Sequence, residues 1–262
     1  MQPSTSRHLS SSKIFSLCVL ICLSALPVLA SQGSIVIRDN VSSKKQNELV
    51  HHPRSITGWS TLDFDREGYL KLGPEDIAKG SSLARQLLYD AVRGSKLIVI
   101  EDASSSADIA FCRVVPALVK TPSDSKTSAF VILIDFSDFR QISGDRAALA
   151  SFNVGWGVLH ELEHVVADSA DPDSEETLGA CEVHINKMRD ELNLPQRANY
   201  FFIESTFQLD PNFQSQFVRM GFQSQDPQTN KLRKYWLVWD FRSVGGLITN
   251  SQTAVARRSS SK

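Results

Sequence analysis

Two histidines and a glutamate stand at a spacing that suits metal chemistry. His160 and His164 are four positions apart, and Glu161 follows the first of them. On an α-helix this spacing puts both imidazoles on one face, about one turn apart, where they can hold a single ion. Glu161 lies beside the first imidazole and can reach a water on that ion. The pattern His-Glu-x-x-His therefore indicates a zinc site that hydrolyses an amide, with Zn²⁺ as cofactor and Glu161 as the catalytic general base.

The residues around this motif favour a buried helix over a solvated one. The preceding segment 152–159 is mostly apolar and small, and Leu162 and Val165 continue the apolar character. Burying two histidines and two glutamates in such a helix would be costly without a metal. Zinc with three protein ligands keeps a fourth position for water and lowers the pKa of that water to about 7.

A catalytic zinc site needs a third protein ligand, which this motif does not supply. Ala167 and Ala170 stand where an extended motif would carry a glycine and a third histidine. Glu182 is the better candidate, because segment 178–186 has a helical register and the segment 168–176 is an acidic loop that lets the chain turn back. Other candidates for the third ligand are His184, which a helix would point away from Glu182, and the loop residues Asp168, Glu175 and Glu176.

Between Val158 and Asn186 the arrangement resembles the gluzincin class of zinc metallopeptidases. The resemblance implies that His160, His164 and Glu182 hold the zinc and that Glu161 is the general base. In that class an acidic residue four positions after the ligand glutamate often orients the first histidine. Here the position holds Asn186, whose carbonyl oxygen can accept the imidazole N–H in the same way. The chain is thus expected to be a small secreted zincin that hydrolyses peptide bonds.

Two other functions remain open from the sequence. One is a zinc amidase that acts on cell-wall peptide. The other is a binding domain without catalysis, in which a four-coordinate zinc stabilises the fold. Within a catalytic site, His184 and Tyr200 are both candidates to donate a hydrogen bond to the oxyanion of the transition state.

The elements that must position these residues predict an α+β fold. A small β-sheet should pack on the helix that carries the motif and on a following helix that carries the third ligand. The apolar run 129–135 is the clearest strand, and its near-continuous apolar character predicts burial on both faces. We expect helices at 74–92, 145–164 (whole, or in two pieces that meet near Gly155 and Gly157) and 177–192, and strands at 96–100, 107–115 and 235–239.

The N-terminus has the order of a secretory signal peptide. Arg7 and Lys13 precede an apolar run, 14–30, which ends in a small residue, and we expect cleavage after Ala30. This predicts a secreted or periplasmic protein; the alternative is an uncleaved membrane anchor. We expect residues 1–30 to be the signal peptide, 31–55 a linker or flexible arm, 56–249 the zincin-like domain and 250–262 a disordered tail.

Composition limits the partners. The 262 residues carry a formal net charge of -1, which gives no reason to expect nucleic acid as a partner. Once the signal peptide is removed, no segment is long and apolar enough to span a membrane. The expected partner is therefore a protein or peptide substrate. Cys112 and Cys181 are the two cysteines outside the signal peptide, and they form either one disulfide or two buried thiols.

Overall fold

The structure is a computed structural model that describes residues 34–73, 77, 79–104, 106–120, 126–210 and 213–245. These residues form a mixed α and β fold with six α-helices and three sheets, which confirms the predicted α+β class. The helices are α1 (Ser43–Thr57), α2 (Ser82–Arg93), α3 (Phe136–Gln141), α4 (Arg146–Ser151), α5 (Val154–Ala167) and α6 (Gly179–Glu191). The strands are β1 (Ser34–Ile37), β2 (Asp63–Phe64), β3 (Leu70–Lys71), β4 (Leu97–Asp102), β5 (Cys112–Lys120), β6 (Lys126–Ile134), β7 (Ser143–Gly144), β8 (Gln196–Arg197), β9 (Ile203–Asp210), β10 (Phe213–Gln225) and β11 (Leu232–Asp240).

A four-stranded sheet in the order β1-β4-β6-β5 lies beside the helices. Strands β1, β4 and β6 are parallel, and β5 pairs antiparallel with β6 at the edge. The two central strands are buried on both faces, as the apolar run 129–135 predicted. Ile98 and Ile132 join the main core with the helices, whereas Val99 and Val131 form a separate apolar cluster with other strand residues.

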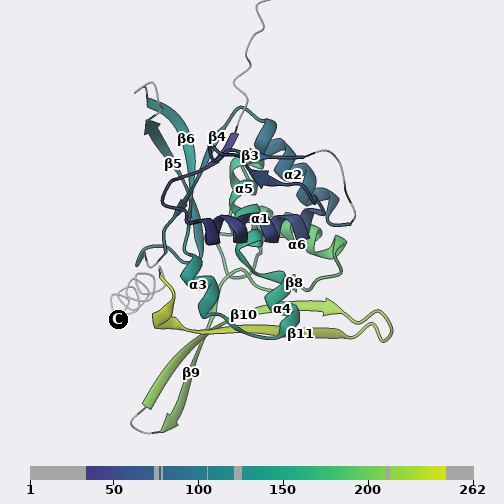
Figure 1. Cartoon of the computed structure of the whole chain (residues 1–262). Helices are drawn as coiled ribbons and strands as arrows, with labels where there is room; N and C mark the ends of the chain where they lie inside the picture. Colours follow the sequence, from purple (N-terminus) through teal and green to yellow (C-terminus); the bar gives the residue numbers. More distant parts are fainter. Residues whose placement is uncertain are drawn as a thin grey trace, which may run out of the picture. The chain divides into compact units, whose positions relative to one another are not determined.

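Helix α5 lies at the centre of the helical layer, and α1, α2 and α6 all pack against it (Figure 1). Its apolar residues Leu159 and Leu162 are fully buried, which fits a helix that is hydrophobic on most sides. Gly155 permits the close approach of α1, because a Cβ at this position would lie 2.6 Å from the Cβ of His52.

The predicted helix 145–164 is in two pieces, α4 and α5. The break comes at Asn153, whose side chain caps α5 by accepting hydrogen bonds from the backbone N–H groups of Gly155 and Trp156. At its other end α5 stops at Asp168, which takes the left-handed conformation with φ 53°. The chain then reverses through a loop that leads to α6.

The second sheet runs β7-β11-β10-β8, with β9 also paired to β10. Figure 1 shows the long strands β10 and β11 beyond the helical layer, on the side of α4 and β8. Strand β11 confirms the strand predicted at 235–239. Its Leu237 and Trp239 pack with Phe111 in a second core cluster. Phe111 has φ 64°, an uncommon value for a bulky side chain, and it directly precedes β5.

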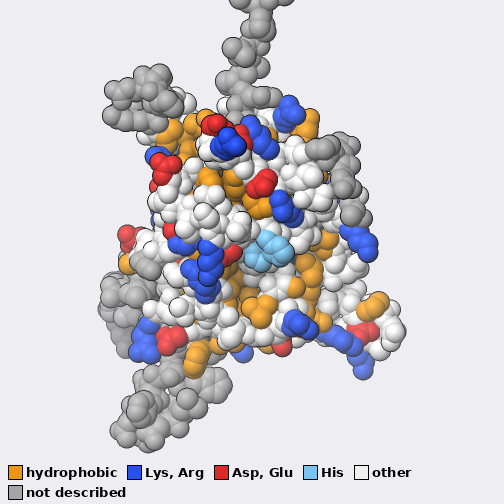
Figure 2. All heavy atoms as spheres, viewed as in Figure 1, with side chains coloured by type: hydrophobic (Ala, Val, Ile, Leu, Met, Phe, Trp, Pro, Cys, Tyr) orange, Lys and Arg blue, Asp and Glu red, His pale blue; other side chains and the backbone are white. Residues whose placement is uncertain are grey.

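The expectation of a linker or flexible arm at 31–55 is wrong for residues 34–55, which the structure describes. Strand β1 pairs with β4, and α1 buries Leu49, Val50 and Ile56 in the main core. The segment looked like an arm because its polar residues outnumber its apolar ones, although the apolar ones share one helix face. Figure 2 shows a histidine patch at the surface over α1, the helix that contains His51 and His52.

The predicted signal peptide and C-terminal tail lie outside the described residues. Among the helices that are described, none has both the length and the apolar character that a membrane crossing requires.

Candidate metal centre

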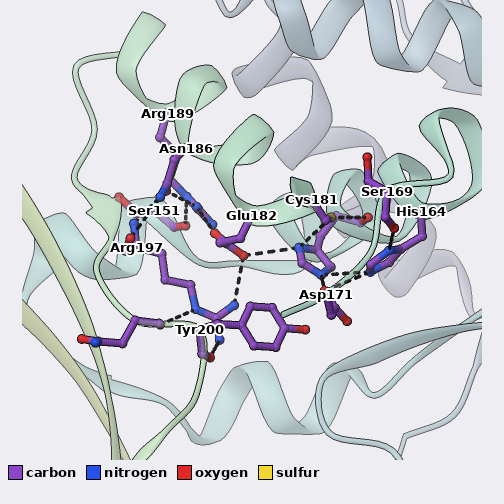
Figure 3. A network of polar contacts seen from close by, with 12 residues as sticks. Ser151, His164, Ser169, Asp171, Cys181, Glu182, Asn186, Arg189, Arg197 and Tyr200 are labelled. Atoms are coloured by element: carbon purple, nitrogen blue, oxygen red, sulfur yellow. Dashed lines mark hydrogen bonds and ion pairs between the residues drawn. The ribbon is translucent and has the colours of Figure 1, made fainter. Parts of the chain in front are cut away.

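Three side chains converge on one point beside α5. The Nε2 atoms of His160 and His164 lie 3.2 Å apart, and Oδ1 of Asp171 lies 3.2 Å from the first and 3.3 Å from the second (Figure 3). The two histidines share one face of the helix, as their spacing predicted. Asp171 comes from the loop that follows the helix, after the chain reverses at Asp168.

Strong electrostatic coupling holds this trio together. Despite the cost of burial, the contacts with both imidazoles lower the pKa of the Asp171 carboxyl far below its usual range. The carboxylate and the backbone carbonyl of Ser169 raise the pKa of His164 to about 11. Three potential ligand atoms thus face one another, and a divalent cation would replace the protons that hold them together.

The other ring nitrogen of His164 is fixed by the loop. Nδ1 of His164 donates to the backbone carbonyl of Ser169 at 2.6 Å. The hydroxyl of Ser169 in turn donates to Glu163 at 3.0 Å, and Glu163 pairs with Nδ1 of His184 at 2.8 Å. This chain of contacts joins α5, the loop and α6, and it leaves Nε2 of His164 free to face Asp171.

The other ring nitrogen of His160 is fixed by a buried carboxylate. Nδ1 of His160 lies 3.3 Å from Glu182, which is 1% exposed. Glu182 forms ion pairs with Arg189 and with Arg197, both buried. Although burial opposes its charge, the two guanidinium groups hold the pKa of Glu182 well below its usual range. The carboxylate is therefore charged, and it orients the ring so that Nε2 points at Asp171.

The predicted third ligand, Glu182, thus lies close to His160 but at Nδ1, on the side of the ring away from His164. The residues placed to share an ion are His160, His164, Asp171 and Cys181, whose ligand atoms all lie within 4.8 Å of one another. Glu182 as a ligand stays a prediction. Asn186 does not meet His160 as expected, because its side-chain carbonyl accepts hydrogen bonds from Arg189 and from the backbone of Arg197.

Asp171 was missed by the sequence analysis, which treated 168–176 as a connection and named other carboxylates in it as candidates. The available signal was the position of the loop, directly after the helical turn that carries His160 and His164. Which of its several carboxylates returns to the histidines depends on the left-handed residue at Asp168, and the sequence pattern does not specify that conformation.

Glu161 is buried beside the first strand residues of β5. Its Oε2 accepts a hydrogen bond of 2.8 Å from the backbone N–H of Val114. The Cys112 thiol also contacts the carboxylate, and burial together with this negative charge raises the pKa of the thiol well above its ordinary value. Cys112 and Cys181 are both free thiols, so the disulfide alternative is wrong for this structure.

The two candidate oxyanion donors lie in different places. His184 pairs with Glu163, whereas the Tyr200 ring stacks on His160 with centroids 6.1 Å apart. The Tyr200 hydroxyl points toward Asp171, and burial and this negative charge raise the pKa of the phenol (Figure 3). Tyr200 is therefore the donor nearer to the three converging atoms.

Comparison of the chain with known protein families, with curated proteins and with solved structures finds no match.

Proposed function

We propose that this protein is a zinc metallopeptidase in which His160, His164 and Asp171 hold the metal. The observation that carries the proposal is the triangle of Nε2, Nε2 and Oδ1, with sides of 3.2, 3.2 and 3.3 Å. Zinc bonds of about 2.0–2.1 Å at tetrahedral angles separate the ligand atoms by about 3.3–3.4 Å. The three atoms are thus spaced like three corners of a zinc tetrahedron, and two imidazoles and a carboxylate are a donor set that suits this ion.

The chain supplies the groups that hydrolysis needs around such an ion. Zinc with three protein ligands supplies an activated water at its open position. Glu161, next to His160 on α5, would be the general base of such a site. The Tyr200 hydroxyl, which points toward Asp171, would be the donor to the oxyanion that develops on a substrate carbonyl.

A peptide substrate is favoured by the strand that borders the site. Among the described strands β5 pairs only with β6, so its outer edge is not paired with another of these strands. Val114 directs its N–H from this edge to Glu161, which puts the edge next to the general base. The alternation of the strand also turns Pro116, which has no N–H, toward this edge, and the N–H of Cys112 is bonded to the carbonyl of Ala110, so near Glu161 a substrate chain would pair through the carbonyl groups of β5.

The test measures zinc and then turnover. We expect one zinc per chain in the purified protein after incubation with the ion, and loss of zinc in Asp171→Ala. Asp173→Ala, which removes an exposed carboxylate of the same loop, is the matched control and should keep zinc. Glu161→Gln should keep zinc and lose cleavage of a peptide library.

Each arm can contradict the proposal. A folded wild-type protein that takes up no zinc removes the basis for the enzyme. Full zinc content in Asp171→Ala would exclude Asp171 as a ligand and return Glu182 to that role. An active Glu161→Gln enzyme would overturn the assigned general base.

A second candidate is a zinc-stabilised domain without catalysis, and Cys181 is the observation that favours it. Its Sγ lies 3.4 Å from Nδ1 of His160 and within 4.8 Å of the ligand atoms of His164 and Asp171. A thiolate in the fourth position would close the site to water. Under this alternative Cys181→Ala loses zinc, and it also loses the stability that the zinc provides. The peptidase proposal instead expects this variant to keep its zinc.

A further inference from the structure

Arg197 uses all three nitrogens of its guanidinium group inside the protein. Nη1 donates to Glu182 at 3.1 Å, Nε donates to the carbonyl of Asn199 at 3.1 Å, and Nη2 donates to the carbonyl of Tyr200. The side chain is buried, and its own backbone is held on both sides by the Asn186 amide. A planar group bonded at every nitrogen has one fixed orientation.

One set of contacts leads from Arg197 to the first histidine. Oε2 of Glu182 is shared between Nη1 of Arg197 and Nδ1 of His160, which lies 3.3 Å away. Arg189 binds the other oxygen, Oε1. Arg197 therefore fixes the carboxylate oxygen that faces the imidazole, whereas Arg189 anchors the oxygen that does not.

A second set of contacts leads to the carboxylate of the triangle. The guanidinium carbon of Arg197 lies 4.6 Å from the centroid of the Tyr200 ring, and Nη2 holds the backbone of the same residue. The Tyr200 ring stacks on His160, and its hydroxyl points toward Asp171 (Figure 3). The position of the tyrosine next to Asp171 thus depends on Arg197.

We propose that Arg197 is a positioning residue for two of the three metal ligands, acting on His160 through Glu182 and on Asp171 through Tyr200. This rests on the proposed zinc site. Arg189 also pairs with Glu182 and is buried, but its other side-chain contacts are to Ser151, Asn186, Trp156 and Phe222, and none is to Tyr200. Substitution of Arg189 should therefore affect mainly the stability of the fold, whereas substitution of Arg197 should affect mainly the metal ligands.

The experiment compares Arg197→Lys with Arg189→Lys, and measures zinc affinity by chelator competition, thermal stability, and the absorption spectrum of the Co²⁺ form. Lysine keeps the charge but loses the planar fork and the stacking. Loss of support for a metal ligand weakens binding about 10- to 100-fold. We expect a loss of that size and an altered Co²⁺ spectrum in Arg197→Lys. Arg189→Lys should be the less stable protein and yet bind zinc more tightly than Arg197→Lys.

Tyr200→Phe keeps the proposal testable if Arg197→Lys does not fold. It removes only the hydroxyl, and we expect weaker zinc binding than in wild type. In the double variant the two losses of zinc affinity should not add, because Arg197 acts on Asp171 through Tyr200 and both substitutions therefore disturb the same contact.

The inference fails if folded Arg197→Lys and Tyr200→Phe both keep wild-type zinc affinity. It also fails if the affinities of the two lysine variants simply follow their thermal stabilities. These outcomes require a wild-type protein that binds zinc, so they differ from failure of the zinc site itself, in which the wild type takes up none.

Discussion

The two histidines of the site are held by different chemistry, although they belong to one turn of α5. On the His160 side, Nδ1 faces a fully buried carboxylate that two buried arginines neutralise. On the His164 side, Nδ1 donates to the backbone carbonyl of Ser169, and the groups behind it include the partly exposed His184. One imidazole is oriented by a network of buried charges and the other by the path of a loop.

This difference predicts which side of the site is more sensitive to substitution. A buried carboxylate with cationic partners is strongly destabilised when one partner is removed, because the remaining charges lose their compensation. A backbone carbonyl cannot be removed by substitution, and the ion pair behind it is partly solvated. The His160 side should therefore respond to substitution far more than the His164 side.

The largest effect is expected from Arg189→Leu. Removal of this partner of Glu182 also breaks the hydrogen bond to Ser151, and we expect the free energy of unfolding to fall by about 3–5 kcal/mol. Denaturant unfolding of the purified protein measures it. The control is Arg140→Leu, which breaks an exposed pair with Glu48 and should cost less than about 1 kcal/mol. Equal losses in the two variants would mean that the buried network does not stabilise the fold.

The next largest effect is expected from a substitution that disturbs the packing of α1 on α5 but leaves in place the groups that orient the histidines. Gly155→Ala introduces a Cβ that would meet the side chain and backbone of His52, so α1 must shift, at a cost of about 1–3 kcal/mol. The convergence of His160 and His164 depends on their shared helical turn and on the groups that orient their rings, Glu182 and the Ser169 carbonyl, which do not come from α1. Zinc affinity, measured by chelator competition, should therefore change little. A large loss of affinity would show that the packing of α1 on α5 also sets the ligand geometry.

A smaller effect is expected on the His164 side. His184→Gln removes a partner of Glu163 but leaves the Ser169 carbonyl in place, and we expect a loss of unfolding free energy of about 0.5–1 kcal/mol with zinc affinity within about threefold of wild type. Unfolding and chelator competition on the same sample test both parts. Loss of zinc would instead identify His184 as a ligand and would remove the contrast between the two sides.

Features that a few neighbouring residues determine could be predicted from the sequence, whereas features that depend on contacts between distant segments could not. The helix with His160 and His164 on one face follows from spacing alone, and the strand at 129–135 follows from its apolar run. Helix α6 was also predicted within two residues of its bounds. These features are local, because a few neighbouring residues determine them.

The rest depends on contacts between distant segments. The role of Glu182 is set by Arg197, which comes from β8, and sequence spacing does not reveal that an arginine will neutralise it. Asp171 reaches the histidines because a loop reverses. The first helix was missed because its polar composition hid Leu49, Val50 and Ile56, whose burial becomes evident only when α5 lies against them. The sequence thus predicted the two histidines and their helix, but not the residues that orient them.

The last prediction concerns a slope with pH and tests whether charge compensation decides the state of a buried carboxylate. Asp138 is 2% exposed, as buried as Glu182, but it accepts hydrogen bonds from backbone N–H groups, including that of Phe111, and has Asp135 nearby in place of arginines. Burial, with a further contribution from Asp135, raises the pKa of Asp138 from 3.8 to about 6. The unfolded chain therefore loses this proton first as the pH rises, so the contribution of Asp138 to stability should fall between pH 4 and pH 6 and stay level above. Asp138→Asn lacks this titration. In denaturant unfolding, wild type should lose stability relative to Asp138→Asn as the pH rises through that range. A difference between the two proteins that does not change with pH would mean that Asp138 is compensated as fully as Glu182, and that burial without a cation does not distinguish the two regions.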